Sequence, residues 1–475
     1  MRKPVDPSSK LWIFSDSSVA SNQNHGQCDC ACAEPVLLRR EFKPQAGHLY
    51  QLYPGFQSVR LDHEVTVGLG KNRPLLLNAS ALELVRRFNS PHPLIGVGWS
   101  RLETAAFDQM VLSGLLIPVG CDDLPPDSPE TLTVWLHITD RCNLRCSYCY
   151  LPHRPENMTY QTGLAVVQAV VRSASLHAFP RIKLKYAGGE PLLQFELLTK
   201  LHTAATRLCE ETGIHLDGVV LTNGTQLTRS RLDQMARLGL RCIVSLDGLG
   251  SGGARQRLTV GGRASTAAVL RGLELAQQAG SDVAVSVTVT NLNLGELVEL
   301  VDWLVENKLD FGLNFHRPAG GLSTGLPDPF ELVAVLRSVY QRLYAHPERL
   351  DGASLLDRAS LLFPHQHPCV AGHSALVFDC TGRVAACPML LGQPVTALDS
   401  PDPLGRLRLA TGDRLNPPVE QIPSCQACEW RSWCAGGCPL LRHTPAHDRY
   451  CQVYRELFPD LLKLEGLRLW NKTGL

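Results

Sequence analysis

Residues 140–150 read Asp-Arg-Cys-Asn-Leu-Arg-Cys-Ser-Tyr-Cys-Tyr and place Cys142, Cys146 and Cys149 in a C-x3-C-x2-C arrangement. Three thiolates on one short loop can hold three irons of a [4Fe–4S] cluster. Because no fourth cysteine follows in the loop, the fourth iron is left open to bind and reduce a ligand. A zinc site or buried free cysteines are the alternatives, but zinc sites usually pair C-x2–4-C with a distant second pair. The sequence therefore predicts a reactive iron–sulfur centre.

Composition narrows the class of protein. The length of 475 residues suggests roughly three domains. The 46 basic and 45 acidic residues nearly cancel, so no overall charge favours nucleic acid or an anionic membrane as a partner. No apolar run reaches the ~18 residues that span a bilayer, and Leu11–Phe14 is too short for a secretory signal. We therefore expect a cytoplasmic enzyme without a membrane or nucleic-acid partner.

The cysteine content is also typical of a cytoplasmic protein. The 17 cysteines are about 4% of the chain, below the ~8–10% of disulfide-rich scaffolds. In reducing surroundings, clustered cysteines indicate metal or redox chemistry rather than disulfides.

The N-terminal part divides into three predicted segments. Residues 1–38 are rich in Ser, Asn and Asp, offer little apolar surface, and are expected to form a flexible arm that carries Cys28, Cys30 and Cys32. Residues 39–120 form a small separate unit, and residues 121–130 form a linker because of their Pro and charge content.

Within residues 39–120 the pattern predicts two strands followed by two helices. Gln57–Gly68 and Arg73–Asn78 are expected to pair as a hairpin. Asn78 is a candidate cap for a helix that carries Leu82, Val85 and Phe88 on one face. A second helix is expected over Thr104–Ser113 and stops at Gly114.

From residue 131 the chain alternates apolar strands with amphipathic helices. The predicted strands are Leu132–Ile138, Ile182–Tyr186, Val219–Thr222, Cys242–Leu246, Val283–Val289 and Phe311–Phe315. Six βα units imply a parallel, right-handed α/β array. Function in such arrays collects on the loops after the carboxyl ends of the strands, and the three-cysteine loop directly follows the first strand.

The loops after the next strands are also distinctive. Ala187-Gly188-Gly189-Glu190-Pro191 follows the second strand, and its two glycines let backbone carbonyls approach a ligand closely, as an ammonium group requires. Thr222-Asn223-Gly224-Thr225 and Ser245-Leu246-Asp247-Gly248 end the third and fourth strands.

The cysteine motif in its Asn-Leu-x-Cys-x-Tyr-Cys-Tyr setting, together with Gly-Gly-Glu-Pro, resembles the S-adenosylmethionine (SAM) site of radical SAM enzymes. The resemblance implies an open partial (β/α)6 barrel over residues 131–360. It also implies that the open iron takes the amino and carboxylate groups of SAM, which one electron then cleaves to a 5′-deoxyadenosyl radical.

The same resemblance assigns roles within the pocket. Gly188, Gly189 and Glu190 receive the amino group of SAM. Ser245 contacts the ribose, Arg257 pairs with the carboxylate as a guanidinium fork, and Tyr148 lies beside the adenine. Capping and covering of helices is the alternative for Ser245 and Arg257. His316 and Arg317 follow the sixth strand, but surface positions are equally expected for them, so they are left outside the predicted site.

A second group of cysteines lies in residues 361–475. Cys369-x12-Gly382-x4-Cys387 is followed by Cys425-x2-Cys428-x5-Cys434-x3-Cys438 and by Cys451. This order resembles the SPASM domain, which holds two auxiliary [4Fe–4S] clusters. A zinc ribbon is the alternative for the middle four cysteines, but it leaves the other three unexplained.

The SPASM resemblance implies two ligand sets. Cys369, Cys387 and Cys438 bind the auxiliary cluster nearer to SAM, and Cys425, Cys428, Cys434 and Cys451 bind the farther one. Cys380 lies where some relatives place a fourth ligand of the nearer cluster, and we assign it there. Three [4Fe–4S] clusters then use eleven cysteines. Of the others, Cys28, Cys30, Cys32 and Cys121 have no assigned role, and Cys209 and Cys242 are expected to be buried as small hydrophobic residues.

Together these features indicate a radical SAM/SPASM oxidoreductase that modifies a ribosomally made peptide or small protein. The expected product is a thioether or a carbon–carbon side-chain crosslink, with flavodoxin or ferredoxin as electron donor. Residues 39–120 resemble the winged-helix peptide-recognition unit of such maturases, with a docking or stability domain as the alternative. Sulfatase-maturing relatives place an Asp base directly after the equivalent of Cys387, whereas Pro388 and Met389 follow here, which disfavours formylglycine formation.

Other functions are also open. The chain could mature an enzyme subunit by forming thioethers, as a quinohemoprotein-type relative does. A second alternative is an iron–sulfur electron carrier, but a carrier needs no ammonium site such as Gly188-Gly189-Glu190. A third is a peptide-binding module attached to a decayed enzyme, but a decayed enzyme would not keep all eleven cysteine ligands.

Overall fold

The computed structural model describes residues 13–14, 48–62, 65–93, 100–120, 130–317, 325–357, 359, 361, 364–442 and 448–473. The predicted arm, apart from residues 13–14, and the predicted linker, apart from residue 130, lie outside the described residues. So do Cys28, Cys30, Cys32 and Cys121.

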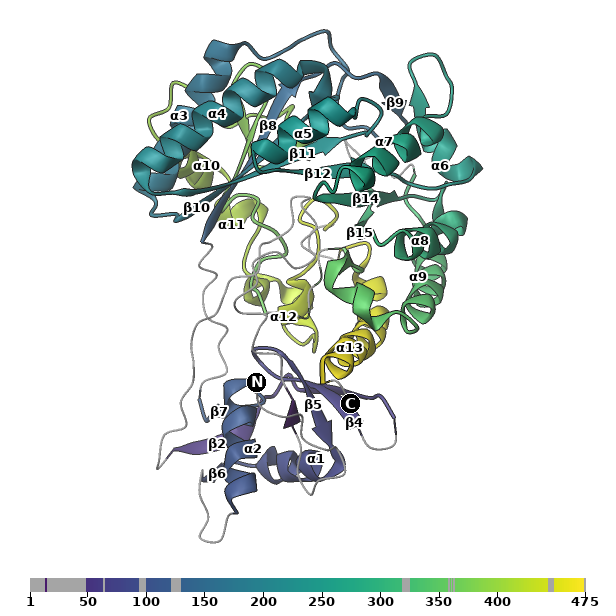
Figure 1. Ribbon diagram of the computed structural model, residues 1–475. Coiled ribbons are helices and arrows are strands. Elements are labelled where there is room, and N and C mark those ends of the chain that lie inside the picture. Colours follow the sequence, from purple (N-terminus) through teal and green to yellow (C-terminus); the bar gives the residue numbers. More distant parts are fainter. Residues whose placement is uncertain are drawn as a thin grey trace.

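The six predicted strands form the centre of one parallel sheet, as expected. They are β8 (Thr131–Thr139), β10 (Arg181–Gly188), β11 (His215–Thr222), β12 (Leu240–Ser245), β14 (Val283–Val289) and β15 (Asp310–Phe315). Each pairs in parallel with the next in this order. The connecting helices lie outside the curved sheet (Figure 1). They are α3 (Tyr160–Leu176), α4 (Phe195–Thr212), α5 (Arg229–Arg237), α6 (Ser251–Gln256), α7 (Thr266–Gln278), α8 (Leu297–Glu306) and α9 (Pro329–Leu343).

Side chains alternate between the two faces of the sheet along each strand. One face packs against the outer helices, and the other faces the inner cavity. In β8, Leu132, Val134 and Leu136 belong to the main hydrophobic core under the helices. Trp135, one residue out of step, packs on the other face with Ala187 of β10. Successive side chains of a strand point to opposite faces, so both faces of this sheet are covered. The α/β class and the open, one-sided array of helices agree with the predicted radical SAM barrel.

The sheet continues beyond the six strands. β16 (Ala353–Ser354) pairs in parallel with β15. On the other edge, β17 (Ala375–Phe378) pairs in parallel with β8, and β18 (Val384–Ala385) pairs antiparallel with β17. The predicted SPASM region, 361–475, therefore begins by extending the sheet of the barrel, and β17 runs beside the strand that leads into the three-cysteine loop.

The rest of the C-terminal region consists of short helices and one long one. They are η7 (Pro388–Leu390), α10 (Pro403–Ala410), α11 (Gly412–Leu415), η8 (Val419–Gln421), η9 (Pro423–Cys425), α12 (Arg431–Cys434) and α13 (Cys451–Thr473). Three further 3-10 turns lie in the barrel, η3 (Pro191–Gln194), η4 (Leu294–Glu296) and η6 (Pro347–Gly352). Helices α11 and α12 lie on the open side of the barrel, whereas α10 packs against α3 (Figure 1).

The N-terminal unit contains two small antiparallel sheets and two helices. One sheet has the order β1 (Ile13–Phe14), β5 (Pro74–Asn78), β4 (Val65–Leu69), β3 (Gln57–Arg60), and the other has the order β6 (His92–Pro93), β2 (Leu49–Leu52), β7 (Leu116–Pro118). The helices are α1 (Ala79–Arg86), continued by η2 (Arg87–Asn89), and α2 (Arg101–Leu112).

The predictions for this unit are confirmed in part. Asn78 caps α1 as predicted, with its side-chain oxygen accepting from the Ala81 amide at 2.9 Å. The predicted strand Gln57–Gly68 is instead the hairpin β3–β4, because the chain turns between residues 60 and 65. The predicted second helix is α2, which begins three residues earlier, at a capping box of Ser100 and Glu103. This arrangement does not confirm the winged-helix resemblance.

Helix α13 joins the N-terminal unit to the barrel. It packs against α9 on the barrel side and against β3, β4 and β5 on the other (Figure 1). In β5, Leu75 and Leu77 belong to the core of the N-terminal unit, whereas Leu76 between them belongs to the main core. One strand therefore contributes to both cores.

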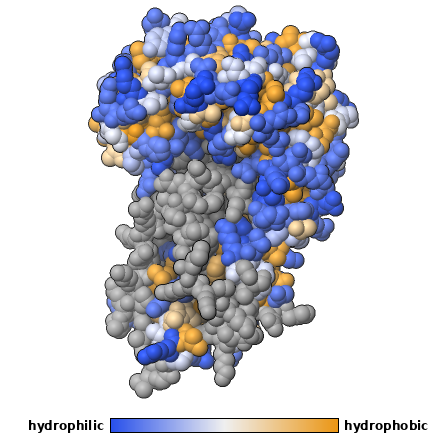
Figure 2. All heavy atoms as spheres, in the orientation of Figure 1, coloured by the Kyte–Doolittle hydropathy of each residue, from blue (hydrophilic) through white to orange (hydrophobic). Residues whose placement is uncertain are grey.

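Within the described residues, no helix combines the length and the apolar character needed to cross a membrane. On the face shown in Figure 2, hydrophilic residues dominate the surface of the barrel helices, with apolar side chains scattered among them. Scattered apolar side chains of this kind are ordinary on protein surfaces.

Candidate active site

A cavity of about 320 Å³ lies inside the sheet, at the carboxyl ends of the strands. Cys142, Cys146 and Cys149 all line it. Five of the six predicted SAM contacts also line it: Tyr148, Gly188, Gly189, Ser245 and Arg257. The structure therefore brings together residues from the ends of β8, β10 and β12 and the loops that follow them, which is where the sequence predicts them.

The Gly-Gly-Glu turn is hydrogen-bonded to the chain just before the first cysteine. The Gly189 amide donates to the Thr139 carbonyl at 2.7 Å, and the Glu190 amide donates to the Arg141 carbonyl at 2.9 Å. The approach is so close that a Cβ at residue 189 would lie 2.1 Å from the Arg141 oxygen. Gly188 has φ +124°, a conformation that other residues rarely adopt. The two glycines thus set the position of the cysteine loop.

Glu190 does not line the cavity, unlike the other predicted contacts. It is fully buried, and it accepts from the Thr222 hydroxyl and from the Asn223 amide, both at 2.7 Å. Burial raises the pKa of its carboxyl, while these hydrogen bonds act in the opposite direction. In the described geometry Glu190 therefore links the turn after β10 to the end of β11, and holds the pocket in place from behind.

The end of β11 in turn contacts the cysteine loop. The Asn223 side-chain amide donates to the Asn143 side-chain oxygen at 2.8 Å and lies 3.8 Å from the Cys142 sulfur. The Leu144 amide donates to the same sulfur at 3.3 Å. Donors aimed at a cysteine sulfur stabilise its thiolate form, which is the form that binds iron.

Arg257 is placed by strand pairing. It begins β13 (Arg257–Thr259), which pairs antiparallel with β9 (Leu144–Cys146), so that Arg257 lies opposite Cys146. Its guanidinium donates to the Tyr148 hydroxyl and lies 3.4 Å from the Asp247 carboxylate. The Tyr148 hydroxyl donates to that same carboxylate at 2.5 Å.

The Arg257 guanidinium also has a hydrogen-bond donor that is available to a ligand. Its Nε is buried and has no hydrogen-bond partner among the described residues. A buried donor without a partner costs free energy, so this atom fits a bound carboxylate such as that of SAM. Asp247 was not selected from the sequence. Its carboxylate, which contacts both Arg257 and Tyr148, is itself held in place because it also accepts from the Thr288 amide at 2.8 Å. Its place in Ser245-Leu246-Asp247-Gly248, directly after a strand, is the signal that could have identified it.

The residues of this cavity therefore fit a three-cysteine [4Fe–4S] cluster and SAM. Burial raises the pKa of the Cys149 thiol to about 11. A metal that binds there must displace the thiol proton, as cysteine ligands generally require.

The downstream cysteines fall into two groups. Cys369, Cys387 and Cys438 line the same cavity as the first triad. A separate cavity of about 300 Å³ is lined by Cys425, Cys428, Cys434 and Cys451. The two groups have the same members as the ligand sets that the SPASM resemblance implies, except for Cys380, and the ligand roles themselves stay predictions.

A sharp turn separates the two groups. Cys434 ends α12, and the next three residues, Ala435, Gly436 and Gly437, have φ of +45°, +82° and +68°. This left-handed run redirects the chain so that Cys438 faces the first cavity. Asp448 secures the turn, because its carboxylate accepts from the Cys438 amide at 2.6 Å.

Cys380 lines neither cavity. Its buried thiol donates to the Asp140 carboxylate at 3.5 Å. Burial raises the pKa of this thiol, and the neighbouring Asp140 charge raises it further. The geometry therefore disfavours the predicted assignment of Cys380 to the nearer cluster. Cys209 and Cys242 are buried, as expected.

Comparison with known proteins agrees with this geometry. The sequence model of the radical SAM superfamily matches residues 136–304, which begin in β8 and include the triad and the ends of the first five strands. Residues 136–304 are a radical SAM domain.

The radical SAM domain has relatives of several activities. A serine-type anaerobic sulfatase-maturating enzyme of Klebsiella aerogenes is 25% identical over 381 residues, which cover 73% of this chain and 91% of that enzyme. A GTP 3′,8-cyclase of Bradyrhizobium diazoefficiens is 32% identical over 206 residues, which cover 42% of this chain. The chain spans only 57% of the length of that cyclase.

Among solved structures, native anSMEcpe with bound AdoMet and Cp18Cys peptide is similar with a TM-score of 0.60 and 19% identity. The match covers 72% of this chain and 99% of that protein. At this identity the similarity is one of fold.

The radical SAM cavity contains two residues that the sequence analysis left out. His316 and Arg317 follow β15 and line the cavity. The ring of His316 lies 6.1 Å from that of Tyr148. The Arg317 Nε lies 3.2 Å from the Cys438 sulfur, and its terminal nitrogen forms an ion pair with the buried Asp357. Both residues directly follow a strand of the parallel sheet, so the expectation that functional residues lie after the carboxyl ends of the strands could have identified them as well.

A third omitted residue, Tyr150, joins the two cysteine-bearing segments. Its hydroxyl donates to the His137 Nε2 at 2.8 Å, and the His137 Nδ1 is 3.2 Å from the Phe378 carbonyl of β17. Burial lowers the pKa of His137 to about 4, so the ring is neutral and donates from Nδ1. Through His137, Tyr150 therefore connects the radical SAM loop to β17, the strand between Cys369 and Cys380.

Replacement of Gly189 by Ala should displace the cysteine loop, because the new Cβ meets the Arg141 carbonyl. We expect loss of about 1–3 kcal/mol of stability from overpacking and selective loss of the iron bound by the triad. Gly295→Ala is the matched control, since neither Gly295 nor Gly189 has a positive φ and an added Cβ at Gly295 has nothing within 4 Å. Iron analysis after anaerobic reconstitution checks this, and equal iron in both variants would contradict it.

The guanidinium of Arg317 should raise the reduction potential of a cluster bound at Cys438, because a cation and an N–H···S bond both favour the reduced state. Arg317→Gln combined with Asp357→Asn removes the cation beside the Cys438 sulfur together with its counter-ion, so that no buried carboxylate is left unpaired. We expect one auxiliary signal to titrate at a more negative potential in electron paramagnetic resonance (EPR) redox titrations. Unchanged potentials for all clusters would refute this role.

Proposed function

We propose that this chain is a radical SAM maturase that joins a cysteine sulfur to a carbon of a ribosomally made peptide or small protein, forming a thioether. The observation that carries the proposal is the shared cavity, with the radical SAM triad and Cys369, Cys387 and Cys438 on its walls. The orientation of Cys380 toward Asp140, away from this cavity, is its second support.

The first part of the proposal concerns SAM. Cys142, Cys146 and Cys149 would hold the cluster, and the unpaired Nε of Arg257 would receive the SAM carboxylate. When bound, this pair of cofactors supplies a 5′-deoxyadenosyl radical, which removes a hydrogen atom from a substrate carbon. Ser245 and the backbone at Gly188 and Gly189 would orient SAM, and a flavodoxin or ferredoxin would deliver the electron that cleaves it.

The second part concerns the nearer auxiliary cluster. If Cys380 is not a ligand, three cysteines hold this cluster and one iron has no protein thiolate, a position that suits a substrate thiolate. The farther cluster would have four cysteine ligands, Cys425, Cys428, Cys434 and Cys451, and would only transfer electrons. Three [4Fe–4S] clusters would then use ten cysteines.

Thioether formation requires a destination for one hydrogen atom, one proton and one electron. The substrate carbon loses one hydrogen atom to the radical, and the substrate thiol loses its proton. Formation of the C–S bond would leave one electron, and a cluster held by the downstream cysteines would supply the acceptor for it. Pro388 and Met389 line the cavity where sulfatase-maturing relatives place a base, and neither side chain can accept a proton. This supports crosslinking over formylglycine formation.

A peptide or small protein as substrate is supported by the relatives. The sulfatase-maturating enzyme aligns with most of this chain, and the solved anSMEcpe structure contains a peptide. In the proposal, the N-terminal unit of residues 39–120 is a recognition unit for such a substrate.

Replacing Cys142, Cys146 and Cys149 together by Ala should abolish release of 5′-deoxyadenosine from SAM under dithionite, because only this triad leaves an iron open for SAM. The auxiliary iron should remain. Cys425, Cys428 and Cys434 replaced together by Ala serve as the matched control, which removes the same number of thiols but should keep SAM cleavage. Continued cleavage by the first variant would overturn the SAM-cleaving part of the proposal.

The open iron of the nearer cluster predicts binding of an external thiol. In the variant that lacks the SAM triad, glutathione should change the auxiliary EPR signals, whereas the analogue with Ser in place of Cys should not. Adding Cys380→Ala should alter neither the iron content nor this response. Loss of auxiliary iron in the Cys380 variant, with no effect of glutathione before the substitution, would favour a carbon–carbon crosslink instead.

A further inference from the structure

Three metal-binding side chains gather outside both cavities. His367, His373 and Asp413 each offer a ligand atom, and these atoms all lie within 4.8 Å of one another. None of the three lines the radical SAM cavity or the cavity of the farther cysteine group. The cluster is therefore separate from the iron–sulfur sites, although it lies beside one of them in the sequence.

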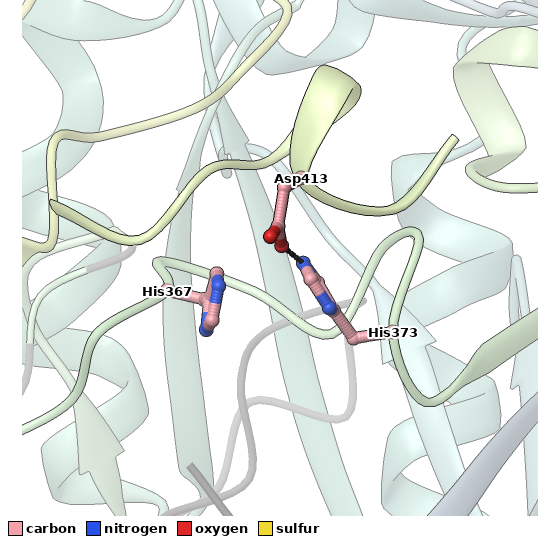
Figure 3. A group of neighbouring side chains, drawn as sticks. All are labelled: His367, His373 and Asp413. Carbon is pink, nitrogen blue, oxygen red and sulfur yellow. Dashed lines mark ion pairs between the residues drawn. The ribbon is translucent and has the colours of Figure 1, made fainter. Parts of the chain in front are cut away.

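The three side chains come from two segments that face each other. His367 and His373 lie on the loop before β17, on either side of Cys369, and Asp413 lies in α11 (Figure 3). The imidazole rings have centroids 4.2 Å apart, with 44° between their planes. The His373 Nε2 lies 3.7 Å from an Asp413 oxygen, and Figure 3 shows the carboxylate directed at this ring.

The backbone that carries these groups is held by other contacts. The Arg408 Nε donates to the His373 carbonyl at 2.6 Å. The His373 Nε2 lies 2.8 Å from the Asn416 carbonyl, just after α11. The Asn416 side-chain amide donates to the Cys369 carbonyl at 2.7 Å. The positions of His373, Cys369 and the end of α11 are thus already coupled.

The chemistry of the donor set selects a class of metal. Two imidazoles and one carboxylate suit borderline divalent ions such as Zn²⁺, whereas Ca²⁺ and Mg²⁺ prefer oxygen ligands. Burial is the main cause that lowers the pKa of His373, and the neighbouring His367 lowers it further, which favours the neutral form that binds metals. Bonds of about 2.0 Å at tetrahedral angles require ligand atoms roughly 3.3 Å apart, so metal binding would draw these atoms together. Binding through the His373 Nε2 would also replace its hydrogen bond to the Asn416 carbonyl.

We propose that His367, His373 and Asp413 bind one Zn²⁺ ion, with water as the fourth ligand, and that this ion fastens the Cys369 loop to α11. Through His367 and His373 the ion holds the chain on both sides of Cys369, and through Asp413 it connects that chain to α11. It therefore stabilises the position of a cysteine that lines the radical SAM cavity, without taking part in SAM chemistry.

The test uses the anaerobically reconstituted full-length protein, with zinc and iron measured together. After incubation with zinc chloride and desalting, we expect one zinc per chain with no loss of iron. Asp413→Asn should weaken zinc affinity at least tenfold in competition with a zinc-binding dye. Asp413 is exposed, so this change should leave the fold intact. His367→Asn should act in the same direction.

His346→Asn is the matched control. The side chain of His346 is 50% exposed and its Nδ1 lies 3.4 Å from a carboxylate oxygen of Glu348, outside the proposed zinc site, so its loss should leave zinc affinity unchanged. Zinc should also raise the melting temperature of the natural protein but not that of the Asp413 variant. The proposal is overturned if no zinc binds, if both variants bind it as tightly as the natural protein, or if zinc enters only as iron is lost.

Discussion

The site depends on two backbone hydrogen bonds between the turn after β10 and the chain that follows β8. The amides of Gly189 and Glu190 donate to the carbonyls of Thr139 and Arg141, directly before the first cysteine. Only glycine permits this approach, because any Cβ at residue 189 would overlap the Arg141 oxygen. Glu190 then fixes the same turn to β11 from the buried side. Three strand ends are joined in this way before any cofactor binds.

The C-terminal region uses the same barrel as a support. Strand β17 extends the sheet beside β8, and the Tyr150–His137–Phe378 hydrogen bonds connect the two cysteine-bearing segments across that edge. The left-handed turn after Cys434 then divides neighbouring cysteines between two cavities. A group at the nearer site would therefore face the radical SAM cluster, and a group at the farther site would lie behind it.

Much of this could be predicted from the sequence. The strands of the barrel are continuous apolar runs, so the α/β class follows from local pattern. The division of the downstream cysteines into two groups follows from the SPASM resemblance, because spacing alone would place Cys438 with Cys425, Cys428 and Cys434. The role of Glu190 could not be predicted, because its partners Thr222 and Asn223 depend on strand register. The same is true of Arg317, whose contact with Cys438 joins residues more than a hundred positions apart. Cys380 shows the limit of spacing, since its position suggests a ligand while its thiol faces Asp140.

The central claim is that a carbon–sulfur bond forms between groups held in one cavity. The most direct measurement is mass spectrometry of peptides encoded beside this chain, after turnover with SAM and a reductant. Thioether formation should remove two hydrogen atoms from a peptide and leave one of its cysteines unreactive toward iodoacetamide. Loss of two hydrogen atoms with every cysteine still reactive would contradict it, because the new bond would then join two carbons.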